Sequence, residues 1–203
     1  MIADLLYQFK HLDQLVISAG YAGLFVIVFS ETGLLAGFFL PGDSLLVTAG
    51  LLASQGVLDI VVLNVLLAAA AILGDSTGYM IGHAAGPRLF KKENSFFFRK
   101  EYLERTHRFF ERHGGKTIIL ARFVPIIRTF APTVAGVGRM AYRQFLFFNV
   151  IGGVLWVTGM TLTGYFLGRL VPDIEKQLHW VILGVIVLSF YPIIHEAIRS
   201  RKK

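Results

Sequence analysis

Several long stretches of the chain hold no Asp, Glu, Lys or Arg, and this spacing of charges constrains the fold more than any other feature. A helix that crosses the hydrocarbon core of a bilayer needs about 20 mostly apolar residues. Residues 144–168 and 177–195 meet this requirement without a charge. Residues 57–83 meet it if Asp59 lies at an interface and Asp75 is tolerated inside a helical bundle. The run that ends at Glu31 is near the lower limit. The sequence therefore predicts about four spanning helices.

The composition agrees with a membrane protein and excludes several other classes. Hydrophobic residues make up 55% of the 203 residues and charged residues 16%, against about 25% charged in soluble domains. A soluble globule of this size would expose too much apolar surface to water. The absence of Cys excludes disulfides, thiolate metal sites and cysteine nucleophiles. The net charge of +7 lies in short segments between apolar runs, which indicates membrane topology and no nucleic-acid partner.

Two apolar segments, 32–53 and 117–138, are poorly suited to span a membrane because each is interrupted by proline. Each arm is only about ten residues long, about half the length that a spanning helix needs. We expect each segment to form a re-entrant helical hairpin, since broken backbone is permitted where protein or water covers it. A kinked spanning helix is the alternative for each segment. The breaks are expected at Pro41, Gly42, Pro125 and Pro132.

The Lys and Arg residues are distributed unevenly along the chain. With both termini in the cytoplasm and each hairpin returning to its own side, 16 of the 20 Lys and Arg residues fall in cytoplasmic pieces. Arg169 and Lys176 fall outside, and Arg122 and Arg128 fall within the membrane. This is the bias that the positive-inside rule predicts for a multi-pass membrane protein with cytoplasmic termini.

The two hairpins then enter from opposite sides, which predicts an inverted repeat. A shift of 86 residues superposes identical residues in the second arm of each hairpin and in the helix that follows. The identities pair Ala49-Gly50 with Ala135-Gly136, Thr77-Gly78-Tyr79 with Thr163-Gly164-Tyr165, and Gly82 with Gly168. Chance similarity of Gly-rich apolar sequence is the alternative explanation. We expect a single membrane domain over 1–203, with repeat 1 at 20–83, a cytoplasmic amphipathic linker at 84–116, repeat 2 at 117–170 and a last spanning helix at 177–196.

Charged residues inside the expected membrane region carry most of the functional information. A central Asp or Arg costs about 2.5–3.5 kcal/mol on the insertion scale, so such groups must pair with one another or line a wet cavity. Two guanidinium groups together with a helix N-terminus make a good receptor for phosphate. The alternative is that the arginines only neutralise the acids. The residues concerned are Glu31, Asp43, Asp75, Arg122 and Arg128.

Residues at the expected hairpin tips have structural as well as binding interpretations. Asp43 can cap the returning arm of the first hairpin, with Ser44 beside it. Thr129 plays the matching role in the second hairpin, where Pro132 fits a first helical turn. Both tips would aim helix N-termini at mid-membrane, where free backbone donors suit an oxyanion. Asp75 has two interpretations, a hydrogen-bonded packing role and a place in a proton relay.

The sequence around these charges resembles the DedA family of bacterial membrane proteins. One motif is FFLPGD at 38–43, which follows ETG at 31–33. The other is ARFVP at 121–125, which continues to RTFAP at 128–132. Two separate motifs in the right order make the resemblance specific.

The resemblance implies a polytopic protein of the bacterial inner membrane with two opposed re-entrant hairpins. Family members are implicated in moving lipids between leaflets, among them undecaprenyl phosphate and phosphatidylethanolamine. Others are linked to maintenance of the proton-motive force. Position by position, the resemblance places the family's essential acidic residues on Glu31 and Asp43 and its essential arginines on Arg122 and Arg128.

These observations lead us to expect a lipid transporter, a flippase or scramblase, that moves a phosphate-bearing headgroup while the lipid tail stays in the bilayer. Arg122 and Arg128 would bind the phosphate, and Glu31 and Asp43 would hold the arginines in the empty site. Protonation of either acid would couple transport to the proton gradient. The alternative is a proton or ion transporter with an indirect effect on lipids. We expect no enzymatic activity, metal or cofactor, and a homo-oligomer is compatible with the sequence.

Overall fold

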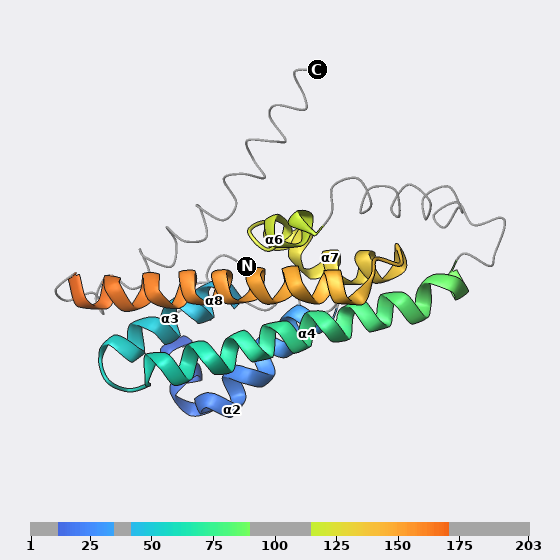
Figure 1. The fold of residues 1–203 in the computed structure, drawn as a ribbon. Coiled ribbons are helices and arrows are strands. Elements are labelled where there is room, and N and C mark those ends of the chain that lie inside the picture. Colours follow the sequence, from blue (N-terminus) through green and yellow to red (C-terminus); the bar gives the residue numbers. More distant parts are fainter. Residues whose placement is uncertain (1–11, 35–41, 90–114, 171–203) are drawn as a thin grey trace, which may run out of the picture. The chain divides into compact units, whose positions relative to one another are not determined.

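The structure, a computed structural model, describes residues 12–34, 42–89 and 115–170 (Figure 1). These residues form α-helices and no strand, which confirms the all-helical expectation for this part of the chain. The first helix bends at Gly20, whose φ and ψ of 56° and −165° lie outside the helical region. The helices are α2 (Leu12–Gly33), α3 (Gly42–Ser54), α4 (Ile60–Leu89), α6 (Lys116–Ala121), α7 (Pro125–Val137) and α8 (Tyr142–Leu170).

Three of these helices are long and apolar enough to cross a membrane. The candidate spans are Val16–Gly33 in α2, Ile60–Gly86 in α4 and Tyr142–Leu170 in α8, with mean hydropathies of 1.5, 2.0 and 1.8. These candidate spans correspond in position to three of the four expected spanning helices. The fourth, 177–196, lies outside the described residues, as does most of the expected linker at 84–116.

The long helices expose apolar side chains and bury charged ones. Val61 and Val65 of α4 are 66% and 67% exposed, and Phe147 of α8 is 61% exposed. By contrast, Glu31 and Asp75 are only 1% and 3% exposed. A soluble protein shows the reverse preference, since charged side chains stay in water. The pattern agrees with helices that turn apolar faces to lipid and keep their charges inside.

The connection between α3 and α4 follows from its own residues. Gly56 has a φ of +80°, in the left-handed region that commonly ends a helix and that glycine adopts without Cβ strain. Asp59 then caps α4, since its Oδ1 accepts hydrogen bonds from the N–H groups of Val61 and Val62 at 2.8 and 2.9 Å. The Asp59 N–H in turn donates to the Tyr21 hydroxyl of α2 at 2.7 Å. The acidic residue before this span therefore starts the helix and ties it to α2.

The described helices divide into two compact units, and each long helix contributes to both. Unit 1 contains the first part of α2, all of α3, the first turns of α4 and the second half of α8. Unit 2 contains the end of α2, the rest of α4, the helices α6 and α7, and the first half of α8.

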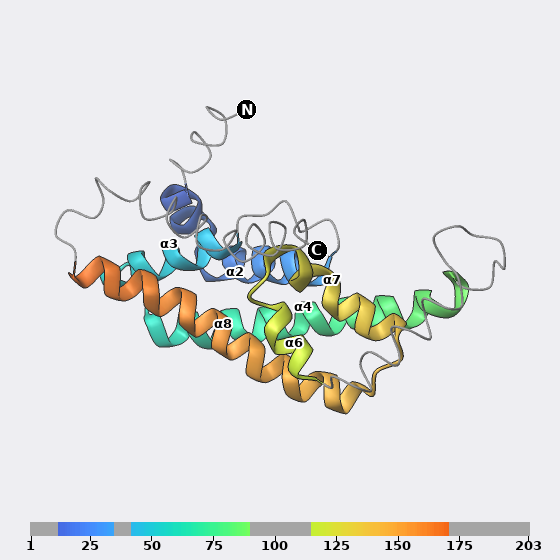
Figure 2. The ribbon, with the colours of Figure 1, turned by 90° about the horizontal axis from the view of Figure 1, so that it is seen from above.

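In unit 1, α3 packs on the second half of α8, and the two helices lie side by side in both ribbon views (Figures 1 and 2). A Cβ on Gly50 would collide with the backbone carbonyl of Thr161, and one on Gly164 with that of Val47. Such close backbone approach is typical of small residues where helices meet in membranes. The Thr161 hydroxyl also donates to Asn64 Oδ1 at 3.0 Å, which joins α8 to the start of α4.

In unit 2, the same kind of contact joins α7 to the second half of α4. A Cβ on Gly136 would collide with the backbone carbonyl of Tyr79, and one on Gly82 with that of Thr133. The short helix α3 precedes α4 in the chain and packs on α8, whereas α7 precedes α8 and packs on α4. The packing is therefore crossed: α3 packs on α8, the long helix that follows α7, and α7 packs on α4, the long helix that follows α3.

These contacts refine the register of the expected repeat. Gly50 and Gly136, which superpose in the 86-residue shift, both lie against the backbone of a long helix. The 86-residue shift pairs Gly164 of α8 with Gly78 of α4, but the nearest neighbours of Gly78 are at ordinary contact distance. The glycine of α4 that lies against the backbone of a short helix, as Gly164 does, is Gly82. The long helices are offset by one turn from the ungapped alignment, and the inverted repeat stays a prediction.

Candidate functional site

The second broken segment consists of two short helices in contact with each other, α6 and α7. Arg122 closes α6, and Val124 has extended backbone angles of φ −117° and ψ 107°. The proline that follows favours this extended conformation. Pro125 is the first residue of α7, a position where the missing N–H leaves no hydrogen bond unmade. A break therefore lies at Pro125, where one was expected.

The start of α7 differs from the expected one. The helix begins at Pro125, so Thr129 is a buried interior residue and not the cap of the returning arm. Pro132 also lies inside the helix and marks no break. The physical reason is that proline at the first helical position sets φ for a helix without removing a needed donor. Arg128, which was expected before the helix start, is consequently part of α7.

The described part of the first broken segment begins at Gly42, and Pro41 lies outside the described residues. Asp43 is the second residue of α3, so it lies in the first turn and not at the cap position. Its Oδ1 accepts a hydrogen bond from Nε1 of Trp156 in α8 at 2.9 Å. Ser44, next to it, is buried. The acid of this segment is thus oriented by an indole N–H from a long helix.

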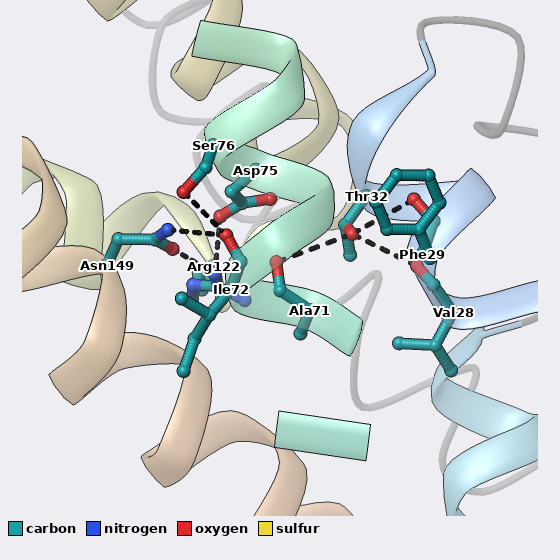
Figure 3. A network of polar contacts seen from close by, with 9 residues as sticks. All are labelled: Val28, Phe29, Thr32, Ala71, Ile72, Asp75, Ser76, Arg122 and Asn149. Carbon is teal, nitrogen blue, oxygen red and sulfur yellow. Dashed lines mark hydrogen bonds and ion pairs between the residues drawn. The ribbon is translucent and has the colours of Figure 1, made fainter. Parts of the chain in front are cut away.

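Glu31 and Arg128 form a buried ion pair in unit 2. Arg128 Nη2 lies 2.5 Å from Glu31 Oε1, and the side chains are 8% and 2% exposed. The end of α2 that carries Glu31 is held against α4 by the next residue. The Thr32 hydroxyl lies 3.0 Å from Val28 O in its own helix and 3.5 Å from Ala71 O in α4 (Figure 3). Helix contact, as well as charge, therefore fixes the acid beside the arginine.

Arg122 lies between two long helices in unit 2. Its Nη2 donates to Asp75 Oδ2 of α4 and to Asn149 Oδ1 of α8 (Figure 3). The side chains of Arg122 and Asp75 are 3% and 4% exposed, and Asn149 is fully buried. The sequence pointed to Glu31 or Asp43 as the acid that holds this arginine, but its carboxylate partner is Asp75. Asp75 thus neutralises a buried arginine, which agrees with the expected pairing of the buried charges, although neither interpretation of Asp75 by itself named Arg122 as its partner.

The two ion pairs form one system of interacting charges within unit 2. The charge of Arg128 acts on Asp75 and Arg122 as well as on its own partner. Pairing removes most of the cost of about 2.5–3.5 kcal/mol that each lone charge would incur in an apolar interior. Guanidinium groups bind carboxylates and phosphates with the same geometry, so each pair can in principle exchange its carboxylate for a phosphate. Among the described residues, no group of three or more His, Asp or Glu side chains comes together to hold a metal.

Three residues of this arrangement were not singled out from the sequence: Asn149, Trp156 and Thr32. The signal for Asn149 was present, because an amide in the middle of an apolar run is typical of a hydrogen bond between membrane helices. Trp156 and Thr32 carried no such signal, since both residue types are common in membrane helices. Their contacts depend on which helices pack together, and the sequence does not state this.

The chain is similar in sequence to known membrane proteins. The family model for the VTT domain matches residues 40–166. The chain is 51% identical over 207 residues to Protein DedA of Escherichia coli (strain K12), covering 100% of this chain and 94% of that protein. It is 53% identical over 167 residues to an uncharacterised membrane protein of Mycobacterium leprae (strain TN), covering 82% and 74%.

A more distant relative is named as an inner membrane protein. The chain is 36% identical over 176 residues to Inner membrane protein YghB of Escherichia coli (strain K12), covering 87% of this chain and 80% of that protein. No solved structure matches the chain. The family match covers more than half of the chain and the identities extend over nearly all of it, so the chain belongs to the VTT-domain family of membrane proteins, the DedA family.

Proposed function

We propose that this protein moves a lipid with a phosphate headgroup, such as undecaprenyl phosphate or a phospholipid, across the bacterial inner membrane as a flippase or scramblase. One observation carries the proposal. Two buried arginines flank the break between α6 and α7, and each is held by a carboxylate from a long helix. A phosphate is the lipid group that matches guanidinium in charge and geometry.

The proposed exchange of partners keeps charge paired at every stage. In the empty site Glu31 neutralises Arg128, and Asp75 neutralises Arg122. A headgroup phosphate that replaces a carboxylate leaves the guanidinium paired, so the arginine never pays the full cost of isolation. Protonation of the released carboxyl group would remove its charge and couple the exchange to the proton gradient. The substrate lipid and protons are therefore the proposed partners.

We further propose that the broken segments are re-entrant hairpins of an inverted repeat, with both termini in the cytoplasm. At 1.5 Å per residue, the 13 residues of α3 and of α7 each extend about 20 Å, short of a hydrocarbon core of about 30 Å. A short helix that ends inside the membrane needs protein around it, and close glycine contacts with a long helix supply this for both. Labelling of single introduced cysteines from either side tests the orientation, because the chain has no Cys of its own.

The test of transport uses purified protein in vesicles that hold a fluorescent phosphatidylglycerol and, separately, a fluorescent glucosylceramide that lacks phosphate. We expect the wild type to move the phospholipid and not the glycolipid. The double variant Arg122→Lys/Arg128→Lys keeps both charges but loses the guanidinium geometry, so we expect the rate to fall by about tenfold or more. Arg169→Lys, at an exposed position at the end of α8, is the matched control. Normal transport by the double variant would refute the proposal.

A proton or ion transporter is the second candidate, and the closed pairing of both arginines favours it. Chains of buried acids and bases are typical of proton relays in membranes. The same vesicles, loaded with a pH-sensitive dye and given an imposed pH gradient, separate the two candidates. Dissipation of the gradient without lipid movement favours ion transport, and lipid movement without a gradient favours the first proposal.

A further inference from the structure

Asn149 makes contacts that the proposed exchange of ion pairs does not require. Its Nδ2 donates to Ile72 O of α4 at 3.1 Å, and its Oδ1 accepts from Arg122 Nη2. The same carbonyl also accepts from the Ser76 hydroxyl at 2.8 Å (Figure 3). Because the side-chain amide is planar and its nitrogen is bonded to the Ile72 carbonyl, the position of the amide oxygen is fixed as well, and it faces the guanidinium.

Two glycines one turn further along α8 complete the surface on which Arg122 lies. A Cβ on Gly152 would come within 3.0 Å of Arg122 Cδ and 3.3 Å of its Nε. A Cβ on Gly153 would come within 3.4 Å of Arg122 Nη2 and 3.1 Å of Ile72 Cγ1. A larger residue at position 152 would therefore crowd Arg122, and one at position 153 would crowd Ile72 while touching Arg122. Asn149, Gly152 and Gly153 together form what we call the arginine cradle.

The guanidinium in this cradle keeps a donor for which the described residues provide no acceptor. Arg122 Nη2 serves both Asp75 and Asn149, whereas Arg122 Nε is buried and has no acceptor among the described residues. A buried N–H without an acceptor is costly, so such groups are rare in folded proteins. An unused donor on a fixed guanidinium is suited to an oxygen of an arriving ligand.

We propose that Asn149 is a positioning residue for Arg122 and that α8, through the arginine cradle, sets the direction in which this arginine meets an anionic headgroup. In this arrangement the Asp75 carboxylate balances the charge of the Arg122 guanidinium, and the neutral Asn149 amide orients the guanidinium by a hydrogen bond. The inference rests on the proposed function, since the ligand is a lipid phosphate. It adds that a neutral residue of a spanning helix belongs to the site.

Four variants separate the orientation of the Arg122 guanidinium from the neutralisation of its charge. Asn149→Leu removes both hydrogen bonds at similar volume, and Asn149→Asp adds a second carboxylate beside Arg122. Asp75→Asn removes the balancing charge, and Asp75→Asn/Asn149→Asp moves the carboxylate from α4 to α8 while one acid and one amide remain. The matched control is Asn64→Leu, which removes an amide that bonds to Thr161 and to Ile60 O of its own helix but contacts no arginine.

Two measurements are made on each variant in vesicles. The first is the rate of phosphatidylglycerol transport as a function of its mole fraction, which separates half-saturation from maximal rate. The second is the rate at which phenylglyoxal, a reagent for arginine, modifies Arg122, read by mass spectrometry. For Asn149→Leu we expect the lipid mole fraction at half-maximal transport rate to rise about tenfold, and the rate of Arg122 modification to rise by a similar factor. This is the size of effect expected when a hydrogen bond to a charged group is lost. For the double variant Asp75→Asn/Asn149→Asp, which we call the exchange variant, we expect both measured values to return most of the way toward those of the wild type.

The outcomes decide the inference one way or the other. Equal behaviour of Asn149→Leu and Asn64→Leu in both measurements would overturn it, and so would an exchange variant as impaired as Asp75→Asn. If Asn149→Leu does not fold, Gly152→Ala takes its place, because its added Cβ would lie 3.0 Å from Arg122 Cδ and 3.3 Å from Arg122 Nε and should displace the guanidinium, with a rise expected in both measurements. If the wild type moves no lipid, the proposed function fails, and the phenylglyoxal rates still decide whether Asn149 positions Arg122.

Discussion

Asp75 and Arg122 are buried together, and removal of either partner should destabilise the protein strongly. The side chains are 4% and 3% exposed, so a lone charge left behind would have little access to water. Breaking a buried ion pair in this way typically costs about 3–5 kcal/mol. For a chain of this length, each kcal/mol corresponds to about 2–4 °C in the midpoint of thermal unfolding. We therefore expect Asp75→Leu and Arg122→Met each to lower the midpoint by about 6–20 °C.

The double variant Asp75→Leu/Arg122→Met should be much less damaged than the sum of the two. It removes both charges, and the structure shows which group then lacks a partner: Asn149 Oδ1, which accepts from Arg122. A buried acceptor without a donor costs about 1–3 kcal/mol. Against a sum of about 6–10 kcal/mol for the single variants, the coupling between the two residues should exceed about 3 kcal/mol.

Thermal unfolding of the purified variants in one detergent, followed by tryptophan fluorescence, measures this coupling. Arg143→Met, an exposed arginine near the start of α8, is the control and should change stability by less than about 0.5 kcal/mol. Single losses that simply add in the double variant would show that the two charges do not depend on each other. That result would refute the assignment of Asp75 as the partner of Arg122.

Three further changes test packing, backbone and hydrogen bonding by the same unfolding measurement. Gly136→Ala places a Cβ against the backbone of α4 and should destabilise the protein by about 1–3 kcal/mol, whereas Gly159→Ala meets nothing within 4 Å and should stabilise it by roughly 0.5–1 kcal/mol. A lower midpoint for Gly159→Ala would contradict this. Arg139→Gly should raise stability by roughly 0.5–1 kcal/mol, because the arginine has a φ of +53° that glycine adopts without strain; an unchanged or lower midpoint would count against it. Trp156→Phe removes the N–H that donates to Asp43 and should cost about 1.5–3 kcal/mol; no loss would mean that this hydrogen bond contributes nothing.

The helices could be predicted from the sequence because their causes are local. A run such as 144–168 has the length and apolar content of a spanning helix, and α8 follows it closely. The start of α7 at Pro125 also had a local signal, the preference of proline for the first helical position. The prediction placed the start later because it gave more weight to Thr129 as a cap.

The pairing of charges could be predicted only in part, because it depends on contacts far apart in the chain. Desolvation cost indicated that the five charges in the expected membrane region, Asp43 among them, must pair with one another or line a wet cavity. Glu31, Asp75, Arg122 and Arg128 lie in buried ion pairs. Which acid meets which arginine depends on how α2, which carries Glu31, and α4, which carries Asp75, pack against the α6–α7 segment. The cost of burial is the same for either choice of partner, so it could not identify Asp75. Asn149 was missed because an uncharged side chain has a much smaller desolvation cost.

The packing of α3 on α8, a helix made much later in the chain, has a consequence for biosynthesis. The ribosome completes α3 long before it makes α8, since 111 positions separate Gly50 from the Thr161 carbonyl against which it lies. At roughly 5–20 residues per second, the nascent α3 waits several seconds for its partner. During that interval the insertion machinery must shelter a helix too short to cross the bilayer alone. We expect chains truncated before α8 to be recognised as unassembled and degraded, whatever the fate of their first two spans.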